Sequence, residues 1–231
     1  MRSQNQSNVI AGRILEASRA TRVPNRSVLV LIVGGSGSGK SWLAYELWHA
    51  LRPHATKLSL DDFYLDRSHL SNARRARLNF DHPRAIDWAA VETVVSRLVA
   101  GHPARVPHYD FKTHSRRPGL KTIKPRKFLL MDGLWLLRRR HLRRLASLSI
   151  FLQCRLETRL RRRLIRDLAS RGRTRLSVET QFHSTVEPMH KLYVAPQSKW
   201  ADFVFKKNIK TTEVRRLASI LRAIPQQVIS S

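Results

Sequence analysis

The chain has 231 residues, with 44 Lys and Arg against 16 Asp and Glu, which gives a formal net charge of +28. That length suffices for one α/β domain with a sizeable core, and the charge favours polyanions such as nucleotides and RNA. No apolar run approaches the roughly eighteen residues of a membrane-spanning helix, and the single Cys154 excludes an internal disulfide.

Residues 1–27 are interpreted as an N-terminal extension, with a short helix over residues 8–20. They lack the apolar segment of a secretory signal, and together with the single cysteine they favour a cytoplasmic location. Their Arg and Ser content leaves a transit peptide as an alternative.

The strongest pattern is a strand, a glycine-rich loop and a helix in immediate succession. An apolar run over 28–33 leads into Gly34-x-x-x-x-Gly39-Lys40-Ser41, and a helical pattern follows over about 40–51. Glycines let consecutive N–H groups point at phosphate oxygens, and the helix N-terminus adds partial positive charge. A flexible Gly/Ser linker is the alternative, but a linker would not lie between a buried strand and an amphipathic helix. The predicted phosphate-donor site comprises Gly35, Ser36, Gly37, Ser38, Gly39, Lys40, Ser41 and Trp42.

The remaining elements alternate between strands and helices. Strands are predicted at 55–60, 128–131, 148–152 and 201–205. Helices are predicted at about 87–100 (capped by Asp87), 155–170, 177–192 and 211–223. Proline and glycine break residues 104–126 into a β-ribbon or loop insertion. This alternation predicts an α/β fold with a mostly parallel sheet, whose binding site lies at the carboxyl ends of the strands.

Two aspartates follow predicted strands at that edge. Asp61 is the candidate base that accepts the proton of an attacking hydroxyl, and Asp132 is the candidate Mg²⁺ ligand together with Ser41. Lys40 would reach the β- and γ-phosphates. The alternatives are an N-cap or turn role for Asp61 and a plain strand-end turn at Asp132-Gly133.

The helix over 155–170 is unusually rich in arginine. Spacings of three and four residues place Arg159, Arg163 and Arg166 on one face. On a lid over about 155–175, such guanidinium groups could close over the triphosphate and stabilise charge during transfer. A solvated or RNA-binding helix face is the alternative.

Five segments resemble the uridine–cytidine kinase family of P-loop kinases, in the family's order over about residues 28–206. Besides the P-loop they are Asn79–Asp87 (NFDHPRAID), Val106–Arg116 (VPHYDFKTHSR), Arg166-Asp167 with Arg171–Arg173, and Val186–His190 with Lys199–Asp202. The resemblance implies a P-loop NTPase three-layer sandwich over 28–231, with ATP or GTP as the phosphate donor.

The resemblance also implies a role for each matching residue. Asp61 matches the catalytic aspartate, Lys40 and Arg166 the other catalytic groups, and Ser41 and Asp132 the Mg²⁺ ligands. Arg163 and Arg166 match donor-side arginines. The substrate-binding matches are Tyr64, Phe80, Asp81, Tyr109, His114, Arg173 and Gln181. A carboxylate suits a ribose diol, and aromatic rings suit a pyrimidine.

Some positions depart from the family pattern: Asp132 replaces the usual Glu, Asp62 the usual Ser, and Arg84 a frequent acidic residue, and Leu134-Trp135 is bulkier than the common short aliphatic residues. The favoured function is 5′-phosphorylation of uridine in pyrimidine salvage, with cytidine as a second candidate substrate. The rivals are a kinase of another small hydroxyl compound (a sugar phosphate, pantothenate or a pyridine nucleoside) and a nucleotide-gated RNA-binding protein, although the sequence shows no aromatic-rich stacking platform. Expected partners are a small nucleoside, no membrane and no specific nucleic acid beyond charge-driven adhesion. The resemblance implies a homo-oligomer, and specifically a tetramer.

Overall fold

The computed structural model describes residues 26–71, 74–75, 78–111, 113–170, 172–206 and 209–223. The helix predicted over 8–20 and the extension over 1–25 lie outside the described residues. No helix in the described part of the chain combines the length and the apolar run that crossing a bilayer requires.

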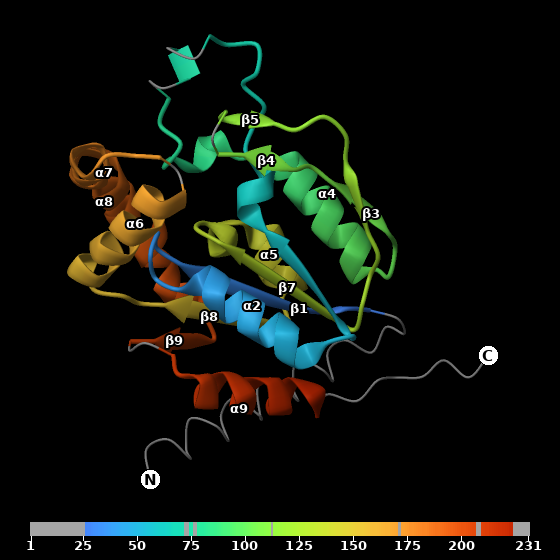
Figure 1. The fold of residues 1–231 in the computed structure, drawn as a ribbon. Coiled ribbons are helices and arrows are strands. Elements are labelled where there is room, and N and C mark those ends of the chain that lie inside the picture. The colour runs from blue at the N-terminus through green and yellow to red at the C-terminus, as the bar shows by residue number, and fades with distance from the viewer. Residues whose placement is uncertain are drawn as a thin grey trace.

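A five-stranded parallel sheet forms the centre of the molecule (Figure 1). Its strand order is β2 (Ala55–Ser59), β7 (Phe128–Gly133), β1 (Val28–Gly34), β8 (Leu148–Leu152) and β9 (Phe203–Phe205). The β1 strand lies in the middle, and its side chains are buried on both faces because helices cover each side. The predicted α/β class with a mostly parallel sheet is confirmed.

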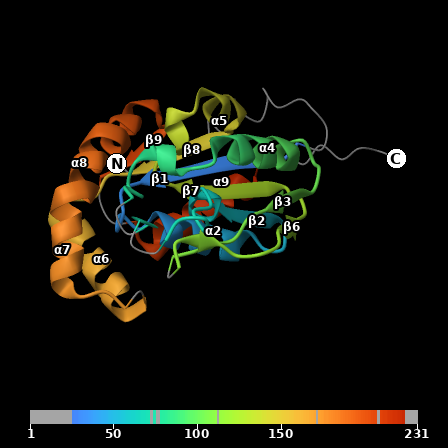
Figure 2. The same ribbon diagram turned by 90° about the horizontal axis from the view of Figure 1, so that it is seen from above.

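Helices form the two outer layers. On one face, α2 (Lys40–Leu51) and α9 (Thr211–Arg222) bury Leu43 and Leu217 against Val30 and Ile32 of β1. On the other, α4 (Trp88–Val99) and α5 (Arg140–Leu145) cover the core that contains Leu31. Figure 2 shows α4 and α5 together on this second face. The Asp87 carboxylate caps α4 as predicted, by accepting from the N–H of Ala90 at 3.0 Å.

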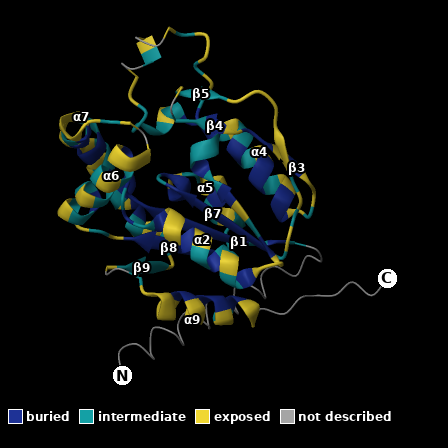
Figure 3. Cartoon of the chain, in the orientation of Figure 1, coloured by how far each residue is buried: buried dark blue, intermediate teal, exposed yellow. Residues whose placement is uncertain are grey.

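Two short antiparallel hairpins fall within the segment predicted as an insertion. One pairs β3 (Ala104–Val106) with β6 (Lys121–Ile123), and the other pairs β4 (Tyr109–Asp110) with β5 (Ser115–Arg116). Neither hairpin joins the main sheet. Figure 3 shows mixed burial along these hairpins, in contrast to the buried strands of the sheet.

Residues 156–200 form a helical arm beside the P-loop (Figure 1). It comprises α6 (Leu156–Ser170), α7 (Arg175–Gln181), a π-helical turn (Phe182–Val186), α8 (Glu187–Met189), a second π-helical turn (His190–Val194) and a 3-10 segment (Ala195–Trp200). The helix predicted over 177–192 is therefore longer and less regular than expected. Gly172 separates α6 from α7 with a φ of 62°, consistent with the predicted break.

Candidate active site

The glycine-rich loop connects β1 to α2 in the geometry that the sequence pattern requires. Gly39, with a φ of 95°, immediately precedes Lys40 at the start of α2. Gly37 has a φ of 78°, and a Cβ there would lie 2.4 Å from the Arg159 carbonyl oxygen of α6. The loop is thus held between the sheet and α6, with its N–H groups at the amino end of α2, a favourable position for an anionic phosphate.

Gly37→Ala is expected to weaken binding of the nucleoside triphosphate by about ten-fold or more. The added Cβ would meet the α6 backbone, which cannot give way as a flexible side chain could, and a left-handed residue adds about 1–2 kcal/mol of strain. Gly119→Ala is the matched control, because Gly119 has a φ of 83° but an added Cβ there would have no neighbouring atom within 4 Å. Titration calorimetry with a non-hydrolysable triphosphate makes the comparison. Equal affinities in the two variants would contradict this view of the loop.

The ends of β1, β2 and β7 bring Lys40, Asp61 and Asp132 together. The parallel register pairs Asp132 of β7 with Ser59 of β2 and with Ile32 of β1. Ser59 is followed by a 3-10 turn (Leu60–Phe63) that carries Asp61, and the Ser59 hydroxyl accepts from the Asp61 N–H at 3.3 Å. Burial raises the pKa of Asp132, Lys40 lowers it, and the charge of Asp61 raises it. The predicted convergence of these strand ends is confirmed.

The oxygen pair at Ser41 and Asp132 fits a magnesium ion. The Ser41 hydroxyl donates to the Asp132 carboxylate at 2.6 Å, so two hard oxygen ligands already lie side by side. Among the described residues, no three His, Cys, Asp or Glu side chains gather into a metal-binding cluster. A magnesium ion needs no such cluster, because it typically takes one or two protein oxygens plus substrate phosphates and water.

One cavity of about 1640 Å³ joins the P-loop to the other predicted site residues. Ser36 and Lys40 line it from the loop, and Asp61 lines it from the neighbouring strand end. The remaining predicted residues on its wall are Tyr64, Phe80, Asp81, Tyr109, His114, Arg163, Arg166, Arg173 and Gln181. Ser41, Asp132 and Trp42 are not among the lining residues, and Trp42 instead lines a smaller hollow with Gly39 and Arg162. Segments far apart in the sequence therefore share one site.

Aromatic rings form one side of the cavity. Tyr64 lies 5.0 Å from Tyr109, and Phe80 stacks on His114 with ring centroids 4.6 Å apart. His114 has a φ of 51°, which is uncommon for a residue other than glycine and typical of functional sites. The Tyr64 hydroxyl donates to the Phe80 carbonyl at 3.1 Å and fixes the two segments together. This surface suits a flat ring system.

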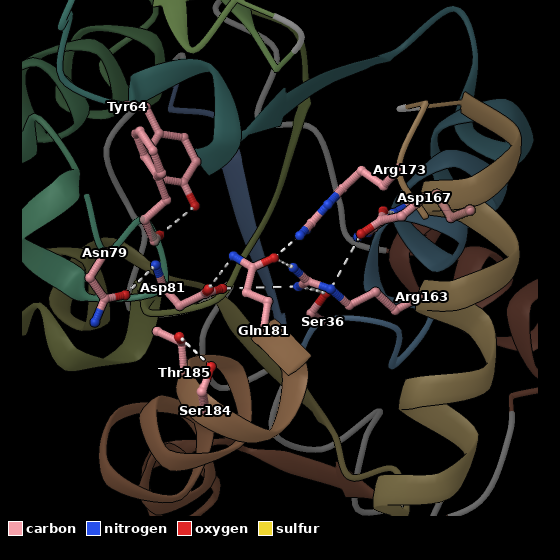
Figure 4. A network of polar contacts seen from close by, with 12 residues as sticks. Ser36, Tyr64, Asn79, Asp81, Arg163, Asp167, Arg173, Gln181, Ser184 and Thr185 are labelled. Carbon is pink, nitrogen blue, oxygen red and sulfur yellow. Dashed lines mark hydrogen bonds and ion pairs between the residues drawn. The ribbon is translucent and has the colours of Figure 1, made fainter. Parts of the chain in front are cut away.

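A polar network crosses the cavity from the P-loop to Asp81 (Figure 4). Arg163 donates to the Ser36 hydroxyl at 3.2 Å and to the Gln181 amide oxygen at 2.9 Å. Gln181 in turn donates to Asp81 at 3.3 Å, and Arg173 also donates to the Gln181 oxygen. Burial raises the pKa of Asp81, while Arg163 and Arg173 oppose that rise. One arginine thus contacts groups on both the phosphate side and the Asp81 side.

The buried face of α6 differs from the face that the spacing predicted. Arg159 and Arg163 are buried, as is Asp167 one turn further on, whereas Arg166 lies at the edge of this face and lines the cavity. Arg159 pairs with Glu187 at 2.5 Å. Asp167 pairs with Arg163 at 3.3 Å and with Arg166 at 2.8 Å. Sequence reasoning assigned no role to Asp167, although its i,i+4 spacing from Arg163 was a usable signal.

His190 packs behind the P-loop and is a second residue that sequence reasoning left without a role. A Cβ on Gly35 would lie 2.7 Å from its Nδ1 atom, so loop and ring are in direct contact. Burial, together with the neighbouring positive charge of Arg159, lowers the pKa of His190 to about 4. The ring is therefore neutral in the folded protein at neutral pH.

Because the folded pKa of His190 lies below its ordinary value of 6.5, the unfolded chain binds more protons in between. The free energy of unfolding therefore decreases as the pH falls from about 6.5 towards 4, by about 1.4 kcal/mol per pH unit. Chemical denaturation gives the free energy of unfolding at each pH in this range. We expect that free energy to change less steeply with pH in His190→Gln than in the wild type. Exposed His183, on the same helical arm, is the control, and an identical slope for the two variants would contradict the prediction.

Comparison with known proteins gives three findings. The model of the Phosphoribulokinase / Uridine kinase family matches residues 29–215. A uridine kinase of Brevibacillus brevis is 35% identical over 178 residues, covering 77% of this chain and 83% of that protein. A uridine kinase of Shewanella amazonensis is 34% identical over 208 residues, covering 88% of this chain and 97% of that protein.

Solved structures share the fold at low identity. Phosphoribulokinase from Rhodobacter spheroides gives a TM-score of 0.57 at 16% identity, covering 83% of this chain and 74% of that one. D-glycerate 3-kinase from Cryptococcus neoformans also gives a TM-score of 0.57, at 18% identity, covering 81% of this chain and 88% of that one.

Proposed function

Because the chain belongs to the Phosphoribulokinase / Uridine kinase family and is a P-loop kinase, we propose that it transfers the γ-phosphate of ATP or GTP to the 5′-hydroxyl of uridine, with cytidine as a further candidate acceptor. The observation that supports this most strongly is the single cavity that joins Lys40 and Asp61 to Asp81 and the aromatic wall. A cytoplasmic role in pyrimidine salvage belongs to the same proposal.

On the donor side, the loop N–H groups and Lys40 hold the β- and γ-phosphates. Ser41 and Asp132 hold Mg²⁺, which when bound neutralises phosphate charge and fixes the orientation of the triphosphate. Arg163, which contacts Ser36 of the loop, and Arg166 line the same cavity and stabilise the charge that spreads over the transferring group.

On the acceptor side, Asp61 accepts the proton of the 5′-hydroxyl as that oxygen attacks. Asp81 receives hydrogen bonds from the ribose diol, because one carboxylate offers two acceptor oxygens. Its side chain is only 13% exposed and already accepts from Gln181, so it is held in position before the nucleoside arrives. The rings of Tyr64, Phe80 and His114 accommodate the pyrimidine.

Incubation of the full chain with magnesium, ATP or GTP and a panel of hydroxyl compounds tests the proposal, with product masses as the readout. The panel holds uridine, cytidine, a pyridine nucleoside, pantothenate and a sugar phosphate. Uridine monophosphate as the dominant product supports the proposal. Robust turnover of another acceptor with none on uridine would replace it, and RNA that competes for the nucleoside site without any phosphorylated product would favour an RNA-binding protein.

A different hydroxyl acceptor is the second candidate, and Asp62 is the observation that favours it. Asp62 follows the candidate base in the same 3-10 turn, and its carboxylate lies 3.6 Å from His108 Nδ1 of the segment before β4. Burial raises the pKa of Asp62, and His108 opposes that rise. Asp62 does not itself line the cavity, so it would influence the choice of acceptor only through the 3-10 turn that also carries Asp61.

A further inference from the structure

Five arginines crowd into the seven residues Arg138–Arg144, on a part of the molecule separate from the cavity. Their sequence, RRRHLRR, covers the end of a 3-10 turn (Leu136–Arg138) and most of α5, and none of them lines the cavity wall. No acidic residue occurs between Asp132 and Glu157 in the sequence. Figure 2 shows α5 beside α4 and away from α6 and α7.

Aromatic rings from distant segments converge on these arginines. The Arg138 guanidinium lies 4.9 Å from the Tyr193 ring, that of Arg139 lies 5.3 Å from Trp88, and that of Arg143 lies 4.7 Å from Trp200. The Lys199 ammonium also lies 4.8 Å from the Trp200 ring. We call Arg138–Arg144 with Trp88, Tyr193, Lys199 and Trp200 the α5 surface. Such stacking holds a guanidinium plane against a ring while its N–H edges can still meet a phosphate.

Buried hydrogen bonds fix the scaffold of the α5 surface. The fully buried Gln197 side chain accepts from the Arg138 N–H at 3.1 Å and donates to the carbonyls of Leu134 at 2.8 Å and Tyr193 at 3.0 Å. It thereby ties the 3-10 turn to the helical arm that carries Tyr193 and Trp200. A ligand would find the cations already positioned, which reduces the entropy that binding must overcome.

Most of the positive charge on this surface is available to a ligand. Glu92 pairs with Arg139 at 2.6 Å, whereas Arg138, Arg140 and Arg144 are exposed. The acid nearest in sequence to Trp200, Asp202, instead accepts from the backbone and the hydroxyl of Ser149 at 2.8 and 2.7 Å.

We propose that the α5 surface binds single-stranded nucleic acid, without sequence specificity and independently of the kinase site. Arginine forks suit phosphate oxygens, and Trp200 is 37% exposed, so a base could stack on the part of its ring that Arg143 and Lys199 leave open. A membrane surface fits less well, because the apolar residue within Arg138–Arg144, Leu142, is buried and cannot insert into lipid.

The test uses the full chain and a fluorescein-labelled oligouridylate, followed by anisotropy between about 50 and 200 mM salt. A triple variant changes Arg138, Arg140 and Arg144 to Gln. The matched control changes Arg105, Lys121 and Lys124 to Gln on the β3–β6 hairpin, so both variants lose the same charge from exposed positions. The α5 variant is expected to bind ten-fold or more weakly, with a salt slope smaller by about 2, since each phosphate contact contributes about 0.7. The control is expected to change by less than about three-fold.

Trp200→Leu separates base stacking from charge alone and is expected to weaken binding about five-fold, the lower end of the range for one stacked base. Saturating ATP is expected to leave oligouridylate affinity unchanged, since the surface does not overlap the cavity. Equal loss in the two triple variants, or full binding by the α5 variant, would overturn the proposal. The proposal would also be overturned if the same arginines bound phosphatidylserine vesicles and the protein did not bind the oligonucleotide.

Discussion

Replacing Asp61 with Asn is expected to slow phosphoryl transfer by about 10²- to 10⁴-fold while leaving nucleotide binding and folding intact. The amide keeps the size of the side chain but cannot accept the proton of the attacking hydroxyl. Asp61 lines the cavity on a short 3-10 turn after β2, so its loss changes chemistry more than packing. Single-turnover rates with uridine, combined with calorimetric affinity for the triphosphate, separate the two effects.

Asp62→Asn is the matched control for this prediction. Asp62 occupies the next position of the same turn, but it is not among the residues on the cavity wall and its carboxylate faces His108. Its replacement removes the same charge within one residue of Asp61 and is expected to change the rate by less than about three-fold. A rate loss of equal size in both variants would show that local charge, rather than a base at Asp61, controls the reaction. Full activity of Asp61→Asn would remove Asp61 from the mechanism.

Local signals in the sequence were sufficient to predict the sheet and the elements at its edge. The central strands β1 and β7 are continuous apolar runs up to their carboxyl ends. Asp87 marks the start of α4 because a carboxylate satisfies free N–H groups at a helix N-terminus. Once the strands are parallel, the loops at their carboxyl ends must share one edge. The proximity of the P-loop, Asp61 and Asp132 follows from that topology.

The interior of the helical arm was not predictable in the same way. Arginine is rarely buried, so the spacing of Arg159 and Arg163 indicated a shared face but not that the face is enclosed. Its burial depends on partners that lie far along the chain, such as Glu187 and Gln181. The stacks on the α5 surface have the same origin, because Trp88, Tyr193 and Trp200 meet α5 only in the folded chain.

Asp167→Asn is expected to have the second large effect, on stability and on turnover together. Asp167 is fully buried, and its carboxylate pairs with Nε of both Arg163 and Arg166. The isosteric amide would leave Arg163 buried with Asp81 at 4.0 Å as its nearest acid. Removing one partner from a buried ion pair costs about 3–5 kcal/mol, and a domain of this size loses about 2–4 °C per kcal/mol. Thermal unfolding should therefore show a midpoint lower by about 10 °C.

Glu179→Gln supplies the control, because Arg175 and Glu179 of α7 form an ion pair with the same i,i+4 spacing but in water. The two side chains are 75% and 33% exposed, and the pair is expected to contribute about 0.5 kcal/mol or less. Asp167 acts on the reaction only through the orientation of two arginines, so it is a positioning residue. At a temperature where both variants are folded, Asp167→Asn should lower kcat about ten-fold or more with little change in KM for uridine, since charge stabilisation matters most in the transition state. An unchanged kcat would restrict Asp167 to a structural role. An equal loss of stability in Glu179→Gln would show that the importance of the Arg163–Asp167 pair does not come from its burial.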